Sequence, residues 1–127
     1  MIRVGIADDH SELRLALRLL LGLFPQYEIV CETSNGQETI ECAKQIQPDV
    51  FVLDIQMPGL DGFNVTKQLM EAGVPTRVLL ISIYRGSYIV KKAEAAGALG
   101  FVPKDDLTIS LLPAIEAVYR GERYFIE

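Results

Sequence analysis

The sequence predicts an α/β fold, a three-layer sandwich in which five helices cover the two faces of a five-stranded parallel sheet. Two observations indicate this fold. Five short apolar runs alternate with stretches of helical periodicity, and residues that stop regular structure lie between them. The 127 residues suffice for one domain with a single core, and no repeat or low-complexity linker divides them.

The first strand is predicted at Ile2–Ala7, and leucines at helical spacing predict the helix that follows it. Either Asp9 or Ser11 can cap the start of this helix, and Pro25 ends it. A second apolar run predicts a strand at Tyr27–Glu32.

The second helix is expected to begin with a capping box formed by Ser34 and Gln37, and Pro48 ends it. The run Val50–Leu53 is apolar at every position, as a central strand covered on both faces requires. A turn rich in Gly and Pro follows, and a third helix is predicted from about residue 60 to residue 72.

The fourth strand is predicted at Val78–Ile81, with a helix of small buried residues over 85–96 behind it. The fifth strand is predicted at Leu99–Val102. Because proline breaks a helix interior, we expect the last helix to begin at a Ser110 cap, which leaves Pro113 in its first turn.

Composition excludes several classes of protein. No apolar stretch approaches the roughly 18 residues of a membrane span, and the chain opens directly into a strand, so a soluble cytoplasmic protein is expected. A formal charge of −5 repels nucleic acid, and direct DNA binding by this segment is not expected. Cys31 and Cys42 are the only cysteines and are expected to remain reduced thiols.

Side chains that can handle a phosphoryl group follow four of the five predicted strands. Asp8 and Asp9 follow the first strand, Asp54 the third, Ser82 the fourth, and Lys104 comes just after the fifth. Because parallel strands bring their carboxyl ends to one edge, where open α/β sheets bind ligands, these side chains are expected to meet there. Three clustered carboxylates need a hard divalent cation, and Mg²⁺ is the usual choice.

Each member of this set has an ordinary alternative on its own, since acidic pairs often cap helices and single lysines are usually solvated. Together they predict metal-assisted phosphoryl transfer. A carboxylate at the tip of a central strand, Asp54, can act as a nucleophile towards phosphorus. Lys104 can neutralise a phosphoryl oxygen as a point charge, and the Ser82 hydroxyl can donate a hydrogen bond to another.

The whole chain resembles a bacterial response-regulator receiver domain of a two-component system. The resemblance rests on the acidic pair Asp8-Asp9, on Asp54-Ile55-Gln56-Met57-Pro58-Gly59-Leu60-Asp61-Gly62, on Ser82, on Ala96-Gly97-Ala98 and on Phe101-Val102-Pro103-Lys104. It implies the flavodoxin-like receiver fold, with the five strands in the order 2-1-3-4-5.

The resemblance also implies the role of each site residue. Asp54 would accept a phosphoryl group from a sensor histidine kinase, and Lys104 would pair with that group. Asp9, Asp54 and the backbone carbonyl of Gln56 would ligate magnesium directly, whereas Asp8 would hold a metal-bound water. Such a domain catalyses its own phosphorylation and dephosphorylation and is not a turnover enzyme.

By the same resemblance, Ser82 is the switch hydroxyl and Phe101 the aromatic residue that responds to phosphorylation. The surface that changes is formed by the fourth helix, the fifth strand and the fifth helix. The segment 114–125 resembles the end of NarL/FixJ-type receivers. This implies a transcription regulator with a possible homodimer, in which residues 121–127 begin a linker to a LuxR-type DNA-binding domain outside this chain.

Two positions depart from the family pattern. Ile83 is larger than the small residue usual after the switch hydroxyl, which predicts narrowed access to Asp54, slow phosphorylation and a long-lived phosphoryl group. Asp105 stands where the family often has proline, so the conformation of that loop is open.

Four alternatives to this function are open. One is a stand-alone receiver that acts through protein contacts, and another is a receiver that signals without phosphate. A phosphatase of the haloacid dehalogenase type would need a second carboxylate two residues after the nucleophile, where this sequence has Gln56. A flavodoxin-like electron carrier would bind the phosphate of FMN, which the carboxylates would repel.

Overall fold

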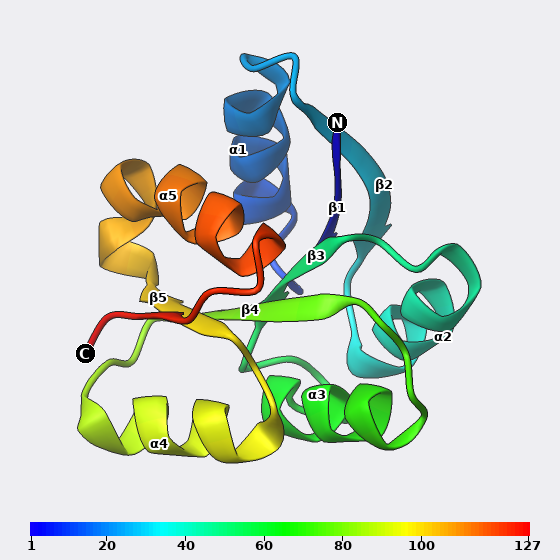
Figure 1. Cartoon of the computed structure of the whole chain (residues 1–127), viewed down its shortest axis with the longest axis vertical. Helices are drawn as coiled ribbons and strands as arrows, with labels where there is room; N and C mark the ends of the chain where they lie inside the picture. The colour runs from blue at the N-terminus through cyan, green and yellow to red at the C-terminus, as the bar shows by residue number, and fades with distance from the viewer.

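The computed structural model describes residues 1–127 as a six-stranded parallel sheet with helices on both faces (Figure 1). The strands are β1 (Ile2–Ala7), β2 (Tyr27–Thr33), β3 (Val50–Asp54), β4 (Arg77–Ser82), β5 (Gly100–Pro103) and β6 (Tyr124–Phe125). The helices are α1 (Ser11–Gly22), α2 (Gly36–Ile46), α3 (Gly62–Glu71), α4 (Ser87–Ala96) and α5 (Leu107–Tyr119), with a 3₁₀ turn at Lys104–Asp106. No helix has the length and apolar character needed to cross a membrane.

The three predicted layers are present. Helices α1 and α5 cover one face of the sheet, and α2, α3 and α4 cover the other (Figure 1). The central strand β3 is buried at every position, as predicted, and its side chains alternate between the two faces. Phe51 and Leu53 join the cluster under α2, α3 and α4, whereas Val50 and Val52 join the cluster under α1 and α5.

The prediction of five strands was wrong by one. The sheet order is β2-β1-β3-β4-β5-β6, so the expected order of the first five strands is confirmed and β6 extends the sheet beyond β5. The amide of Tyr124 donates to the carbonyl of Leu99 at 2.9 Å, and that of Ile126 donates to the carbonyl of Phe101 at 3.0 Å. A strand of two residues is too short to show a periodic pattern, so it can be recognised only from its pairing.

Three helix starts also differ from the prediction. The N-cap of α1 is His10 rather than Asp9 or Ser11, and no side chain caps that helix. The N-cap of α2 is Asn35, whose side chain accepts a hydrogen bond from the Glu38 amide at 2.9 Å, and Glu38 in turn accepts from the Ser34 amide. The cap therefore lies one residue later than the expected Ser34 box. The sequence offers two overlapping polar spacings, and the backbone of the turn selects between them.

Helix α5 begins at Leu107, three residues before the expected Ser110 cap, and Pro113 lies inside it. Burial of Leu107 against the core favours the earlier start, after a 3₁₀ turn that continues directly into the helix. Pro113 has no amide N–H, so the carbonyl of Ile109, four residues earlier, lacks its helical partner. Ile109 is 83% exposed, and water can hydrate this carbonyl.

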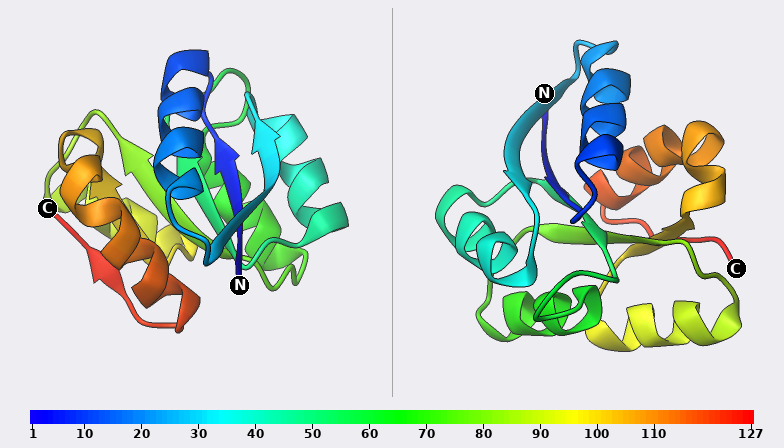
Figure 2. Two further views of the ribbon diagram at one scale, coloured as in Figure 1. Left: turned by 90° about the horizontal axis from the view of Figure 1, so that it is seen from above. Right: turned by 180° about the vertical axis from the view of Figure 1, so that it is seen from behind.

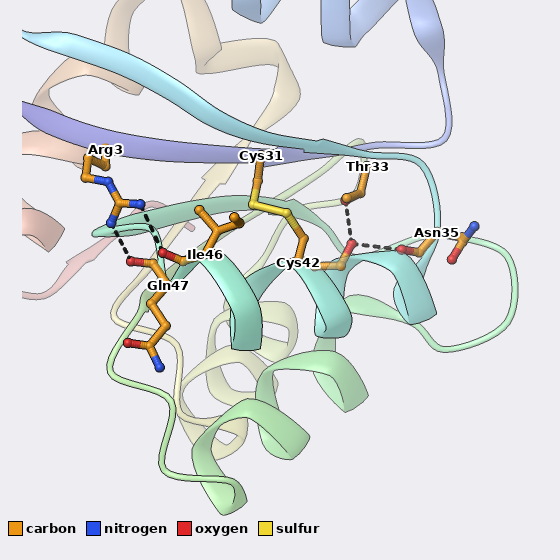
Figure 3. The surroundings of a disulfide bond; sticks show 8 residues. Arg3, Cys31, Thr33, Asn35, Cys42, Ile46 and Gln47 are labelled. Atoms are coloured by element: carbon orange, nitrogen blue, oxygen red, sulfur yellow. Dashed lines mark hydrogen bonds between the residues drawn. A yellow bond between two sulfur atoms is a disulfide. The ribbon is translucent and has the colours of Figure 1, made fainter.

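Cys31 and Cys42 form a disulfide between β2 and α2, so the expectation of two reduced thiols was wrong (Figure 3). The chain reverses direction between these residues, and both the inner face of β2 and the facing side of α2 then carry a cysteine. Only the packing of the helix on the strand brings the two positions together, which spacing in the sequence does not reveal. The Thr39 hydroxyl donates to the Asn35 carbonyl at 2.8 Å and accepts from the Thr33 hydroxyl at 2.7 Å, and these hydrogen bonds hold the same helix at its start (Figure 3).

Reduction of this disulfide is expected to lower the free energy of unfolding by about 3 kcal/mol, because the bond closes a loop with a sequence separation of 11 and so restricts the unfolded chain. Urea unfolding with and without dithiothreitol measures the difference. The control is the double variant Cys31→Ser/Cys42→Ser, whose stability should not respond to the reductant. Equal stability of the oxidised and reduced wild type would contradict the prediction.

Candidate functional site

The strands all point the same way (Figure 2). The predicted site residues lie at or directly after the ends of four of them. Asp54 is the last residue of β3 and Ser82 the last residue of β4. Asp8 and Asp9 directly follow β1, and Lys104 directly follows β5. The strand order reverses between β1 and β3, so the carboxylates flank the point at which open α/β sheets form a ligand crevice.

One lysine bridges the two buried carboxylates. The Lys104 Nζ lies 2.8 Å from Asp8 Oδ2 and 3.3 Å from Asp54 Oδ2. The side chains of Asp8 and Asp54 are 0% and 1% exposed, and that of Lys104 is 14% exposed. The site therefore holds two buried carboxylates and one ammonium that is largely shielded from bulk water.

This arrangement disfavours the charged form of Asp54. The pKa of Asp54 is raised from 3.8 to about 6, chiefly by burial and then by the negative charge of Asp8. The Lys104 ammonium and the backbone N–H of Gln56 oppose the rise and lower the pKa. The nucleophile expected from the sequence is thus a carboxylate whose charge is only partly compensated by the protein.

The residues fit a divalent cation with oxygen ligands. Carboxylate oxygens of Asp8, Asp9 and Asp54 and a ring nitrogen of His10 all lie within 4.8 Å of one another. Asp8 Oδ2 and Asp54 Oδ2 are buried and have no polar partner besides the Lys104 ammonium, so each oxygen keeps a lone pair for a ligand. A hard cation such as Mg²⁺ matches this donor set.

His10 is a site residue that the sequence analysis missed. Its Nδ1 lies 3.1 Å from an oxygen of Asp8 and 3.1 Å from an oxygen of Asp9, although the side chain is 70% exposed. Its position directly after the acidic pair was the only available signal. A histidine at a helix start usually has no such role, so this signal is weak.

The loop after β3 packs closely against Asp54. The Gln56 amide donates to Asp54 Oδ1 at 3.3 Å, and the Gly62 amide donates to the Ile55 carbonyl at 2.7 Å. A Cβ added to Gly62 would lie 2.6 Å from the Asp54 carbonyl oxygen, so only glycine allows this approach of α3 to the strand end. A pocket of about 490 Å³ opens beside this loop, lined in part by Asp9, Gln56 and Asp61.

The two predicted switch residues lie on neighbouring strands. Ser82 is fully buried at the end of β4, and its hydroxyl donates to Gln56 Oε1 at 2.8 Å. Phe101 on β5 is also fully buried, and it pairs in register with Leu80 of β4. Both positions are as predicted, but the hydrogen bond from Ser82 to the Gln56 side chain was not expected.

The family model of the response regulator receiver domain matches residues 4–116. The transcriptional regulatory protein YxjL of Bacillus subtilis, which is described as uncharacterized, is 34% identical over 98% of this chain and 57% of its own length. A nitrate/nitrite response regulator protein homolog of Haemophilus influenzae is 34% identical over 95% of this chain and 58% of its own. The chain thus spans less than two thirds of either relative.

Solved structures agree with these sequence matches. A two-component response regulator of the LuxR family from Aurantimonas sp. superimposes with a TM-score of 0.93 and 31% identity, over 98% of this chain and 89% of the other. The similar proteins are NarL/LuxR-type response regulators, and their matched part is the receiver. The chain therefore belongs to the response regulator receiver domain family.

Proposed function

We propose that this receiver accepts a phosphoryl group on Asp54 from a sensor histidine kinase, in the presence of Mg²⁺. The observation that carries the proposal is the buried Asp54 carboxylate, held with Asp8 around the single ammonium of Lys104 at the carboxyl edge of the sheet. An oxygen of Asp54 would bond to phosphorus as the bond from phosphorus to the kinase histidine breaks. The released imidazole then takes up a proton.

Each neighbouring group has a separate task in this proposal. Asp9, Asp54 and the backbone carbonyl of Gln56 would hold Mg²⁺ directly, and Asp8 would hold a metal-bound water. The ion, when bound, supplies positive charge against the phosphoryl oxygens. Lys104 is free to neutralise a phosphoryl oxygen once Asp54 no longer carries a full charge. Asp8 keeps the lysine in place, since it is the nearer of its two partners.

We further propose that the new dianion changes the surface formed by α4, β5 and α5. Ser82 ends β4, which pairs on one side with β3, where Asp54 lies, and on the other with β5, which carries Phe101. A hydrogen bond from Ser82 to the phosphoryl group would favour one of two arrangements of these elements. Transmission to a partner would follow from this change, without turnover of an external substrate, as is typical of receiver domains.

The output is proposed to be control of transcription. This chain matches only 57% and 58% of the length of the two regulators named above. The solved LuxR-family structure is also that of a two-component response regulator. On this proposal, residues 121–127 lead into a linker, a DNA-binding domain lies outside this chain, and the protein forms a homodimer in the cytoplasm. A stand-alone receiver is the alternative output.

Incubation with acetyl phosphate and Mg²⁺ tests the proposed function. Intact mass spectrometry is expected to show the gain of one phosphoryl group per chain, and EDTA is expected to prevent it. No gain from acetyl phosphate and none from a histidine kinase would leave a receiver that signals without phosphate. Release of phosphate from external phosphomonoesters would instead support a phosphatase.

Replacing Ile83 with alanine is expected to accelerate both phosphorylation by acetyl phosphate and loss of the phosphoryl group. Ile83 directly follows Ser82 and is 63% exposed, so its removal should not disturb the core. Both rates can be measured by following intact mass with time. Ile109→Ala, at another exposed isoleucine, is the matched control, and unchanged rates in Ile83→Ala would refute narrowed access.

A further inference from the structure

The Ser82 hydroxyl is fully engaged by groups outside the carboxylate cluster. Its oxygen accepts a hydrogen bond from the Tyr84 amide at 3.0 Å, and it donates to Gln56 Oε1 at 2.8 Å. A serine hydroxyl carries one proton and can donate only one hydrogen bond. In this structure that proton points to the Gln56 side chain.

A phosphoryl group on Asp54 would compete for the same proton. Its oxygens can only accept hydrogen bonds, so Ser82 can reach them only as a donor. Donation to the phosphoryl group and donation to Gln56 are therefore mutually exclusive. The Gln56 contact belongs to the unphosphorylated arrangement and stabilises it.

We propose that the Gln56 side chain is a positioning residue that holds Ser82 in the unphosphorylated arrangement and so weakens the response of the site to phosphorylation. This inference rests on the proposed function, and it concerns the side chain alone. The backbone amide of Gln56 donates to Asp54, and its carbonyl is the proposed metal ligand, so both remain when the side chain is replaced.

The side-chain amide of Gln56 binds the Ser82 hydroxyl weakly enough for a phosphoryl group to displace it. Gln56 is exposed, so water can hydrate its side-chain Oε1 as soon as the Ser82 hydroxyl leaves. Breaking this hydrogen bond therefore costs little free energy. A carboxylate here would bind the hydroxyl more strongly and would add negative charge beside Asp8, Asp9 and Asp54. An apolar side chain would leave the proton of Ser82 available to the phosphoryl group.

Binding of the phosphomimetic beryllofluoride in saturating Mg²⁺ tests the inference, with isothermal titration calorimetry as the readout. Gln56→Met keeps the length of the side chain and removes the acceptor. It is expected to bind beryllofluoride roughly threefold to tenfold more tightly than the wild type, the effect of one hydrogen bond. In a Ser82→Ala background the same substitution should change the affinity by less than about twofold.

Gln45→Met, at an exposed glutamine in the last turn of α2, ahead of the start of β3 rather than at its end, is the matched control and should bind as the wild type does. Gln56→Leu provides a second variant, and thermal unfolding checks that each protein folds. Equal or weaker binding by Gln56→Met would overturn the inference, and so would an equal gain in the Ser82→Ala background. If wild type binds no beryllofluoride, the proposed function fails together with the inference, whereas binding by wild type without an effect of Gln56→Met refutes the inference alone.

Discussion

Replacing Asp54 with asparagine is expected to abolish incorporation of a phosphoryl group from acetyl phosphate while leaving the fold intact. A carboxamide oxygen is a poor nucleophile, and Asp54 is the only carboxylate at the end of the central strand β3. Asp8 is not expected to take over, because both of its oxygens are engaged: Oδ2 lies 2.8 Å from the Lys104 Nζ, and Oδ1 accepts from the His10 amide at 2.8 Å. Intact mass spectrometry in saturating Mg²⁺ should show no added phosphoryl group.

Asp61→Asn provides the matched control. Asp61 lines the pocket beside the site and caps α3 through the Asn64 amide at 2.9 Å, and asparagine is an equally good cap. This variant should still be phosphorylated. Incorporation by Asp54→Asn at the rate of the wild type would show that another residue is the nucleophile.

The same Asp54→Asn substitution is expected to raise the free energy of unfolding by roughly 2 to 3 kcal/mol near neutral pH in metal-free buffer. The pKa of Asp54 rises from 3.8 to about 6 on folding, and each unit corresponds to about 1.4 kcal/mol. Burial and the nearby Asp8 thus make the charged carboxylate unfavourable in the folded protein. Asparagine removes the charge with almost no change in shape.

The gain in the free energy of unfolding must depend on pH, and the direction of this dependence follows from proton binding by Asp54. Between pH 3.8 and about 6 the folded state holds the proton of Asp54 more tightly than the unfolded state does, so wild-type stability falls as the pH rises through this range. Below pH 3.8 Asp54 is protonated in the folded and the unfolded state, so its charge does not reduce the free energy of unfolding. Above about pH 6 it is ionised in both states, and the reduction reaches its full size.

Urea unfolding of wild type and Asp54→Asn between pH 4 and pH 8 measures this difference. The stability gained by the variant should be small near pH 4, grow through pH 6 and then level off. Mg²⁺ at neutral pH should stabilise wild type more than the variant, because a bound cation offsets the same repulsion. A gain that does not change with pH, or a variant less stable than wild type, would contradict this account.

The order of strands and helices and the main site residues followed from the sequence for one physical reason. Parallel strands joined by crossover helices all end at one edge, so a polar residue after each apolar run must lie near the others. Asp8, Asp54, Ser82 and Lys104 each occupy such a position. Their meeting needed only the fold class and no details of packing.

The features that the sequence did not reveal depend on tertiary contacts. Strand β6 is defined by pairing with β5, and the disulfide depends on how α2 lies on β2. The start of α5 was set by burial of Leu107, which outweighed the local preference of Pro113. The Ser82–Gln56 hydrogen bond joins the end of β4 to the loop after β3, 26 residues apart, and no local pattern encodes it.

Chemical trapping of the phosphorylated residue tests the central claim most directly. After incubation with acetyl phosphate and Mg²⁺, borohydride reduces an aspartyl phosphate to homoserine, and peptide mass spectrometry locates the changed position. The account predicts homoserine at position 54 and nowhere else, and none without Mg²⁺. Reduction at Asp8 or Asp9, or a phosphoryl group on Ser82 that resists borohydride, would contradict it.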